Sequence, residues 1–284
     1  MAAFFFIMHN LAKGYSCITE HYSLFCASNK PKSIWTEIMV SFLFHLGRFF
    51  LLLGSMFRTL ERPIIYYRLM MSEMVSMIMG SMVIVVIISV FIGAVSTLQT
   101  AYQLVTSLVP NSIIGSVVSA TTLLELSPTV LTFILAGRIG SKIASEIGTM
   151  RVTEQIDALE VMGVNASAYL ILPKVLAGLV AFPVLVTISA FLAHLGGMVA
   201  GDVSGAVTSL EFTIGVQTYY DPYQVLVMYV KAFTFGFIIT TVSAYQGFYT
   251  RGGALEVGAS STKAVVYSCL SMVLADYLIA EIML

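Results

Sequence analysis

Three ionisable residues stand inside long apolar runs of the sequence: Glu125, Lys231 and Asp276. Charged side chains within a membrane span are unfavourable, so they usually pair with one another or face an aqueous cavity, and they often mark a substrate or proton pathway. We therefore expect the three residues to form one charge network between neighbouring spans. The network either takes part in transport or only locks the helices together, and the sequence leaves both roles open.

A second candidate for chemistry is the segment 142–163, KIASEIGTMRVTEQIDALEVMG, which is too charged to remain in lipid. We expect it to break at Gly148 into two short helices. Thr153 is the predicted N-cap of the second helix, because a side-chain oxygen there can accept a hydrogen bond from the first turn. Gly163 is the predicted residue just after its end, where glycine most often takes a left-handed conformation.

The second predicted helix has an apolar face and an acidic stripe, formed by Ile156, Leu159 and Met162 and by Glu154, Asp157 and Glu160. Such a helix offers apolar side chains to a groove of a partner protein and carboxylates to basic residues around that groove. The alternative is a helix that lies on the membrane surface. Its acidity argues against this, because the inner leaflet is anionic and surface helices are usually basic.

The composition predicts an all-α polytopic membrane protein. Of the 284 residues 58% are hydrophobic and 10% are charged, whereas soluble domains contain about 25% charged residues. A net charge of -1 gives no reason to expect nucleic acid as a partner. The sequence contains neither a phosphate-binding loop nor a metal-ligand motif, so a catalytic site is not expected and any energy from ATP must come from a partner.

The uncharged runs predict five membrane spans over residues 74–98, 112–137, 175–201, 222–249 and 263–283. Charged residues interrupt the apolar segment 35–67, which favours an interfacial or re-entrant helix. Residues 202–221 are expected to form an ordered loop, and residues 1–33 a variable extension. The small residues of the third span, Gly178, Gly196, Gly197 and Gly201, are expected to allow close helix approach.

Lysine and arginine are distributed unequally between the two sides of the predicted spans. They cluster before the first span, between the second and third, and between the fourth and fifth, whereas the loops 99–111 and 202–221 contain neither residue. Since cytoplasmic loops carry the excess of positive charge, the basic side is expected to be cytoplasmic. This assigns the N-terminus and the segment 142–163 to the cytoplasm and the C-terminus to the outside.

Several runs resemble the MlaE (YrbE-like) permeases of MCE-type ABC lipid transporters, over roughly residues 40 to 284. The runs are ELSP at 125–128, AGR at 136–138, EIGTM at 146–150, VTEQIDAL at 152–159 and MGV at 162–164. The resemblance implies a single permease domain over 34–284 in the bacterial inner membrane, with five spans, an interfacial N-terminal helix and short coupling helices. It also implies a homodimer.

The resemblance further implies partners and binding residues. A cytoplasmic ABC ATPase, which supplies the ATP and Mg sites, is expected to contact Glu146, Thr153, Glu154, Gln155, Asp157 and Glu160. A phospholipid is expected near Leu98, Gln99 and Tyr102, and an MCE-domain protein on the periplasmic side. This chain is expected to hold no cofactor of its own, and spans two and three are expected to transmit the ATPase movement as rigid elements.

The resulting functional hypothesis is a permease subunit that moves phospholipid, or a similar lipid, between the inner membrane and a periplasmic MCE protein. The alternative is a proton-coupled secondary carrier that uses Glu125, Lys231 and Asp276 without an ATPase. A third possibility is a membrane scaffold that transports nothing.

Overall fold

The computed structural model describes residues 34–56, 63–104, 110, 112–218 and 220–283. It divides into two units, Met1–Arg48 and Phe49–Leu284. The described part of the first unit is the beginning of helix α2 (Ile34–Met56), and the predicted extension 1–33 lies outside the described residues. The architecture below concerns the second unit.

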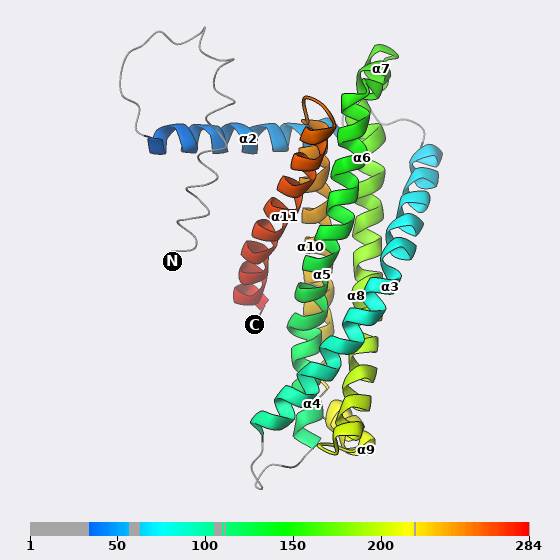
Figure 1. Cartoon of the computed structure of the whole chain (residues 1–284), viewed down its shortest axis with the longest axis vertical. Coiled ribbons are helices and arrows are strands. Elements are labelled where there is room, and N and C mark those ends of the chain that lie inside the picture. The colour runs from blue at the N-terminus through cyan, green and yellow to red at the C-terminus, as the bar shows by residue number, and fades with distance from the viewer. Residues whose placement is uncertain (1–33, 57–62, 105–109, 111, 219, 284) are drawn as a thin grey trace. The chain divides into compact units, whose positions relative to one another are not determined.

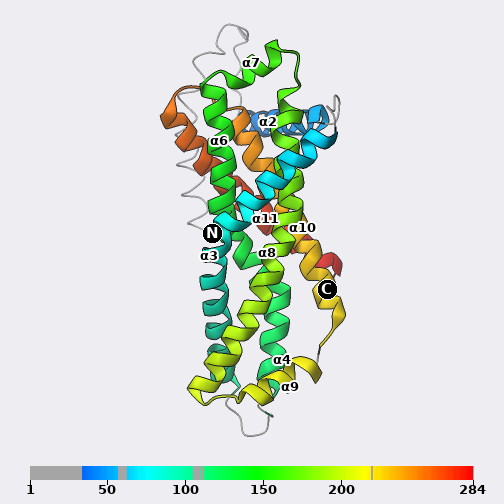
Figure 2. The same cartoon turned by 90° about the vertical axis from the view of Figure 1, so that its right-hand side faces the viewer.

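All regular elements among the described residues are helical (Figure 1). After α2 they are α3 (Pro63–Gln103), α4 (Ser112–Thr121), η2 (Thr122–Val130), α5 (Leu131–Leu135), η3 (Ala136–Gly140), α6 (Ser141–Val152), α7 (Gln155–Val161), α8 (Ala166–Ser204), α9 (Ser209–Thr218), α10 (Pro222–Phe248) and α11 (Ala254–Met283). Helices α7 and α9 lie at opposite ends of the bundle in both views (Figures 1 and 2).

Five helices of the described chain are long and apolar enough to cross a membrane: Ile64–Gln103, Ser112–Val152, Ala166–Ser204, Pro222–Phe248 and Ala254–Met283. This confirms the predicted number of spans. The first and third spans extend beyond the predicted ranges at both ends, the second at its end and the fifth at its start, whereas the fourth agrees with 222–249 to within one residue. The apolar helix Leu43–Met56 is shorter than these spans, in agreement with the predicted interfacial helix.

The segment 202–221 is not the loop that we expected, because it contains α9. Thr208 and Glu211 form a capping box at the start of this helix: the Thr208 backbone N–H donates to Glu211 Oε2 at 3.1 Å, and the Glu211 N–H donates to Thr208 Oγ1 at 3.3 Å. The S/T-x-x-E signature was therefore present in the sequence. Its weak hydrophobic periodicity concealed the helix.

The second span is not a regular α-helix. Two π-helical stretches, η2 and η3, flank the short α5. In η2 the N–H of Leu131 bonds to the carbonyl of Leu126, five residues back. The second span is therefore irregular, and π-helical turns of this kind are often found at functional sites.

Glycines bring α8 into close contact with its neighbours, as predicted. A Cβ atom on Gly196 would overlap the backbone of Val90 in α3, and one on Gly178 would overlap Thr240 in α10. Helices α3 and α8 accordingly lie side by side in both views (Figures 1 and 2). Small residues stabilise such pairs in lipid because they let the helix backbones approach each other.

We expect Gly196→Ala to destabilise the protein by about 1–3 kcal/mol, the usual effect of overpacking. The added methyl group meets backbone atoms of Val90, which cannot move aside as a flexible side chain can. The measurement is the thermal unfolding midpoint of the purified protein in detergent. Gly258→Ala in α11 is the matched control, since no heavy atom lies within 4 Å of its Cβ position; equal midpoints for the two variants would contradict the close-packing argument.

Candidate functional site

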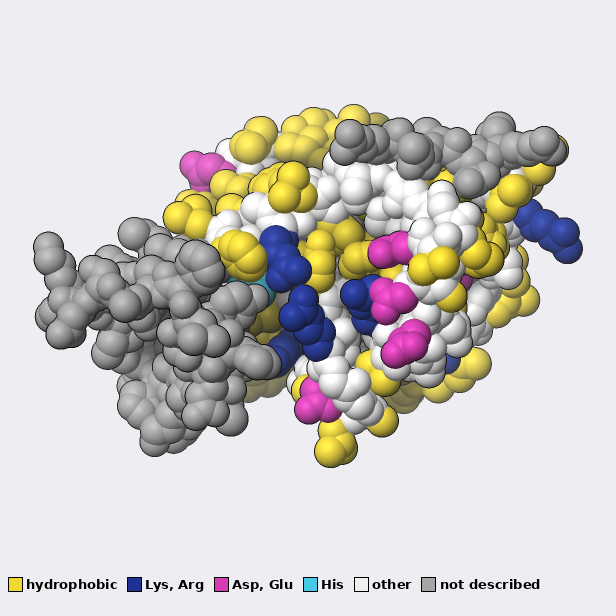
Figure 3. All heavy atoms as spheres, turned by 90° about the horizontal axis from the view of Figure 1, so that it is seen from above, with side chains coloured by type: hydrophobic (Ala, Val, Ile, Leu, Met, Phe, Trp, Pro, Cys, Tyr) yellow, Lys and Arg dark blue, Asp and Glu magenta, His cyan; other side chains and the backbone are white. Residues whose placement is uncertain are grey.

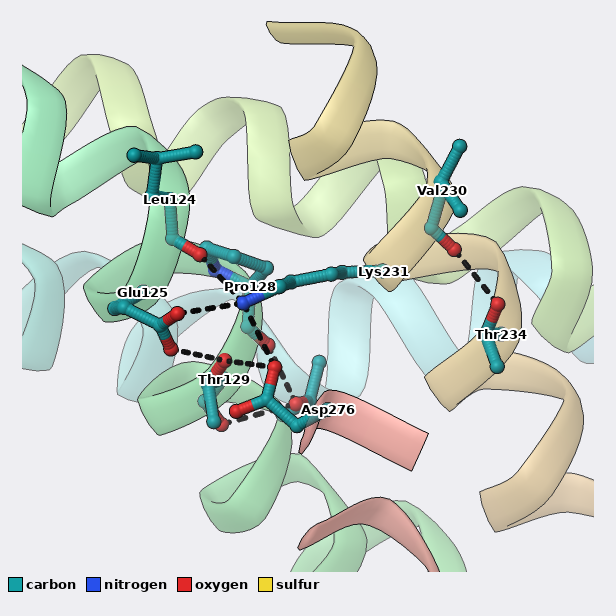
Figure 4. A network of polar contacts seen from close by, with 9 residues as sticks. Leu124, Glu125, Pro128, Thr129, Val230, Lys231, Thr234 and Asp276 are labelled. Carbon is teal, nitrogen blue, oxygen red and sulfur yellow. Dashed lines mark hydrogen bonds and ion pairs between the residues drawn. The ribbon is translucent and has the colours of Figure 1, made fainter. Parts of the chain in front are cut away.

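The three predicted intramembrane charges meet at one point of the bundle. Lys231 is fully buried, and its Nζ lies 2.7 Å from Glu125 Oε1 and 2.7 Å from Asp276 Oδ1. Its side chain extends from α10 toward η2 and α11 (Figure 4). By its position in the sequence, the backbone of Lys231 is expected nearer the outer face than Glu125 and Asp276. Its long side chain spans this difference in depth. We call these three residues the Lys231 clamp.

The Lys231 ammonium has a third partner in the irregular second span. Its Nζ donates to the backbone carbonyl of Leu124 at 3.0 Å. Leu124 lies in η2, which also contains Pro128, a residue with no backbone N–H to donate within the helix. In lipid every backbone polar group needs a partner, so the lysine stabilises the irregular helix as well as the two carboxylates.

The clamp is open on one side. The side chain of Glu125 is 49% exposed and that of Asp276 is 20% exposed in this chain. Thr129 Oγ1 lies 3.2 Å from Glu125 Oε2 and 3.4 Å from Asp276 Oδ1, so its hydroxyl can donate to either acid. A half-exposed carboxylate inside a span must face water or another chain rather than hydrocarbon.

A second clamp, which the sequence analysis missed, surrounds Lys174 of α8. Its side chain is 6% exposed, and its Nζ lies 2.6 Å from Glu73 Oε1 of α3 and 2.7 Å from Glu146 Oε2 of α6. We call these residues the Lys174 clamp; it joins α3, α6 and α8 toward the α7 end. Glu146 was predicted to contact the ATPase, whereas its carboxylate pairs within the chain.

The break in the segment 142–163 differs from the prediction. Gly148 lies within α6, where a side chain would press against Val257 and Thr250. The turn instead falls at Thr153 and Glu154, and Glu154 takes a left-handed conformation with φ 59°. Thr153 is not an N-cap, because its hydroxyl donates back to the carbonyl of Thr149 at 2.8 Å.

The end of α7 is as predicted. Gly163 has φ 80°, its N–H donates to the carbonyl of Glu160 at 3.0 Å, and the N–H of Val164 donates to the carbonyl of Leu159 at 3.1 Å. These two bonds make a Schellman motif. It ends α7 sharply before Asn165, whose side chain caps α8 by accepting from the N–H of Ala168.

The faces of α7 are divided differently from the prediction. Ile156 is fully buried against the chain itself, so it is not available to a partner protein. Val161 and Met162, 89% and 68% exposed, are the apolar side chains that α7 presents outward. The other predicted coupling residues, Thr153, Glu154, Gln155, Asp157 and Glu160, are all exposed.

An ion pair holds α7 in its orientation. Arg151 Nη1 lies 2.6 Å from Asp157 Oδ1, and the Arg151 guanidinium also lies over the ring of Phe248 at 6.0 Å. Arg151 lies in the last turn of α6, at the end of the second span. The position of α7 is thus linked directly to that span.

The predicted lipid residues lie at the α9 end of α3. Leu98, Gln99 and Tyr102 are exposed, Tyr102 at 84%. The exposed apolar face of α3 continues away from them through Val95, Phe91, Ile87, Val83 and Met79, at a spacing of about one helical turn. We call this row of side chains the α3 stripe.

Among the described residues no group of three or more His, Cys, Asp or Glu could hold a metal ion. The clamps bring charged groups of opposite sign together within the spans, a geometry suited to binding and to joining helices.

The comparison with known families matches residues 70–282 to the family described as Permease MlaE. A probable ABC transporter permease protein of Rickettsia bellii is 35% identical over 84% of this chain and 91% of its own length. One of Synechocystis is 34% identical over 90% of this chain and 94% of its own. The intermembrane phospholipid transport system permease protein MlaE of Haemophilus influenzae is 28% identical over 86% of this chain and 94% of its own.

Proposed function

Since the chain belongs to the MlaE permease family and is an ABC transporter permease, we propose that it moves phospholipid, or a similar lipid, between the bacterial inner membrane and a periplasmic MCE-domain protein. The name of the Haemophilus influenzae relative supports the choice of phospholipid. The observation that carries the proposal is α7, a short acidic helix at one end of a bundle of five membrane spans.

The distribution of charge supports an orientation with α7 in the cytoplasm. Arg138, Lys142 and Arg151 precede α7 on one continuous helical span, Arg251 lies in the connection between the last two spans, and Lys263 lies in the first half of α11. Seen from the α7 end, Lys and Arg side chains gather near the middle of the surface, with Asp and Glu beside them (Figure 3). The positive-inside rule then assigns this end, and the N-terminus, to the cytoplasm.

The energy source in this proposal is a separate cytoplasmic ABC ATPase, which binds ATP and Mg. The ATPase contacts the exposed carboxylates of α7, together with Val161 and Met162. Movement of α7 passes through α6 to the irregular second span, and through the Lys174 clamp to α3. Because π-helical turns can rearrange, the second span bends as it transmits the movement, rather than acting as a rigid rod.

A homodimer completes the site in this proposal. The half-exposed Glu125 carboxylate cannot face hydrocarbon, so a second copy, or a cavity between two copies, covers the open side of the Lys231 clamp. The lipid lies between the copies near Leu98, Gln99 and Tyr102. Tyr102 is 84% exposed in this chain, which supports a surface that another molecule covers.

The test of this function is lipid transfer by the complex reconstituted in liposomes. We expect transfer to require the ATPase and ATP, and to persist when the proton gradient is collapsed. The open Lys231 clamp favours one second candidate, a proton-coupled carrier. Transfer that follows the proton gradient and continues without the ATPase would establish that candidate instead.

We expect Glu154→Lys and Asp157→Lys to prevent binding of the ATPase without unfolding the spans. Each change reverses the charge of an exposed side chain, and the Asp157 change also removes the pair with Arg151. The measurement is co-purification of the ATPase with the permease. Asp202→Lys, the same reversal at the end of α8 remote from α7, is the control; full co-purification with both α7 variants would refute the docking assignment.

A further inference from the structure

A small cavity with both charged and apolar lining opens between α3 and the second span, on the α7 side of the Lys231 clamp. Its volume is about 60 Å³, room for more than one water molecule. It is lined by Glu73, Ser76, Met77, Gly80, Ser81, Arg138, Ile139, Lys142, Ile143 and Glu146. Both signs of charge therefore face the same small space, which we call the α3 notch.

Arg138 and Glu73 of the notch each keep a hydrogen-bonding group that no described residue of the protein uses. Arg138 is exposed, and no acidic side chain of the described chain lies within ion-pair distance of its guanidinium. Glu73 uses Oε1 to bind Lys174, whereas its Oε2 has no partner among the described residues. The notch thus presents an unpaired cation and an unpaired carboxylate oxygen.

From these two groups we infer that the α3 notch binds the zwitterionic headgroup of a phospholipid that carries a primary ammonium. The phosphate contacts the Arg138 guanidinium, whose planar donors suit phosphate oxygens, with Ser81 lining the same space. The ammonium donates to Glu73 Oε2. In the orientation proposed above, this lipid belongs to the cytoplasmic leaflet.

The charges in the notch disfavour other headgroups. A headgroup without an ammonium brings no positive charge to Glu73 Oε2, so it lacks the charge-assisted hydrogen bond at that end of the notch. A trimethylammonium group has no N–H to donate to Glu73 Oε2, and it needs more room than a primary ammonium. Lys142 does not replace Arg138, because it already donates to Ser76 at 2.6 Å and lies 3.7 Å from Glu146.

The α3 stripe supplies the apolar half of the lipid site. It starts at Met79, next to Gly80 of the notch, and continues to Leu98 and Tyr102. Acyl chains of a headgroup held in the notch can therefore lie on Met79, Val83 and Ile87. The notch and the predicted lipid residues lie on one helix face, so we assign the notch to the cytoplasmic-leaflet end of the lipid path; this role in transport rests on the proposed function.

The experiment measures lipid retained by the isolated, delipidated permease, by native mass spectrometry in detergent without any ATPase. The probes are phosphatidylethanolamine, its mono-, di- and trimethylated forms, and phosphatidylglycerol, all with the same acyl chains. We expect retention to fall with each methylation, by about tenfold in all, which corresponds to about 1.4 kcal/mol. Soluble glycerophosphoethanolamine at the same concentration should compete poorly, because it lacks acyl chains.

The protein side is tested with Arg138→Gln, which is expected to lower the retention of phosphatidylethanolamine, because the phosphate loses its guanidinium contact. Arg251→Gln is the matched control, an exposed arginine outside the notch. Gly80→Leu is a second variant that narrows the notch without removing a charge. Equal retention of all headgroups, or Arg138→Gln and Gly80→Leu proteins that bind as the Arg251→Gln protein does, would overturn the inference. ATP-dependent transfer by the wild-type complex would still support the proposed function in that case.

Discussion

A Lys231→Met variant is expected to lose about 3–5 kcal/mol of stability, the usual effect of removing one partner of a buried ion pair. The ammonium is fully buried and is shared by Glu125, Asp276 and the carbonyl of Leu124. Without it, two carboxylates repel each other inside the span and a backbone carbonyl lacks its donor. The measurement is the thermal unfolding midpoint in detergent, together with the yield of folded protein.

The triple variant Glu125→Gln, Lys231→Met, Asp276→Asn separates packing from function at the Lys231 clamp. It leaves no uncompensated charge, so we expect most of the lost stability to return. Lys263→Met, which removes an exposed lysine from α11, is the control and should resemble the wild type. A folded triple variant that transfers lipid at the wild-type rate would show that the clamp only locks the helices together.

The Lys231 clamp could be predicted because its three residues interrupt uncharged runs. Few explanations other than mutual pairing account for an acid or a lysine in the middle of a span. Its geometry could not be predicted in the same way. The sequence does not say that Lys231 also binds the carbonyl of Leu124, because the two residues lie on different helices, more than one hundred positions apart.

The Lys174 clamp escaped prediction because its residues stand at the ends of apolar runs. A lysine at such a position usually extends toward the headgroups. Lys174 is one of the basic residues between the second and third predicted spans, which were used only to assign the cytoplasmic side. Its burial follows from the close packing of α3 and α8. The same tertiary packing buries Ile156, which the helical pattern alone assigned to a partner-facing surface.

The two clamps join different sets of helices within the bundle. The Lys231 clamp joins η2, α10 and α11, whereas the Lys174 clamp joins α3, α6 and α8. The second span contributes to both, through Glu125 in η2 and Glu146 in α6. The irregular stretch between them, with α5 and η3, therefore connects the two clamps along the chain.

We expect Lys174→Met to separate ATP hydrolysis from lipid transfer and to lower stability by up to about 3 kcal/mol, the lower end of the range for a broken buried pair. The smaller loss follows from the exposure of Glu73 and Glu146, whose side chains are 28% and 36% exposed. The variant frees α6, which leads to α7, from α3, which carries the predicted lipid residues. The measurement is lipid transferred per ATP hydrolysed by the reconstituted complex.

Lys142→Met is the matched control for this experiment. Lys142 also pairs with Glu146 at 3.7 Å and donates to Ser76 of α3 at 2.6 Å, but its side chain is 46% exposed, and such surface contacts contribute only about 0–1 kcal/mol. We expect it to leave the coupling ratio unchanged. Lys174→Arg should restore much of the ratio, because a guanidinium can still bridge two carboxylates. If Lys174→Met and Lys142→Met gave the same ratio, α3 and α6 would move together without the buried lysine, and the link would have to lie in the packing of α8.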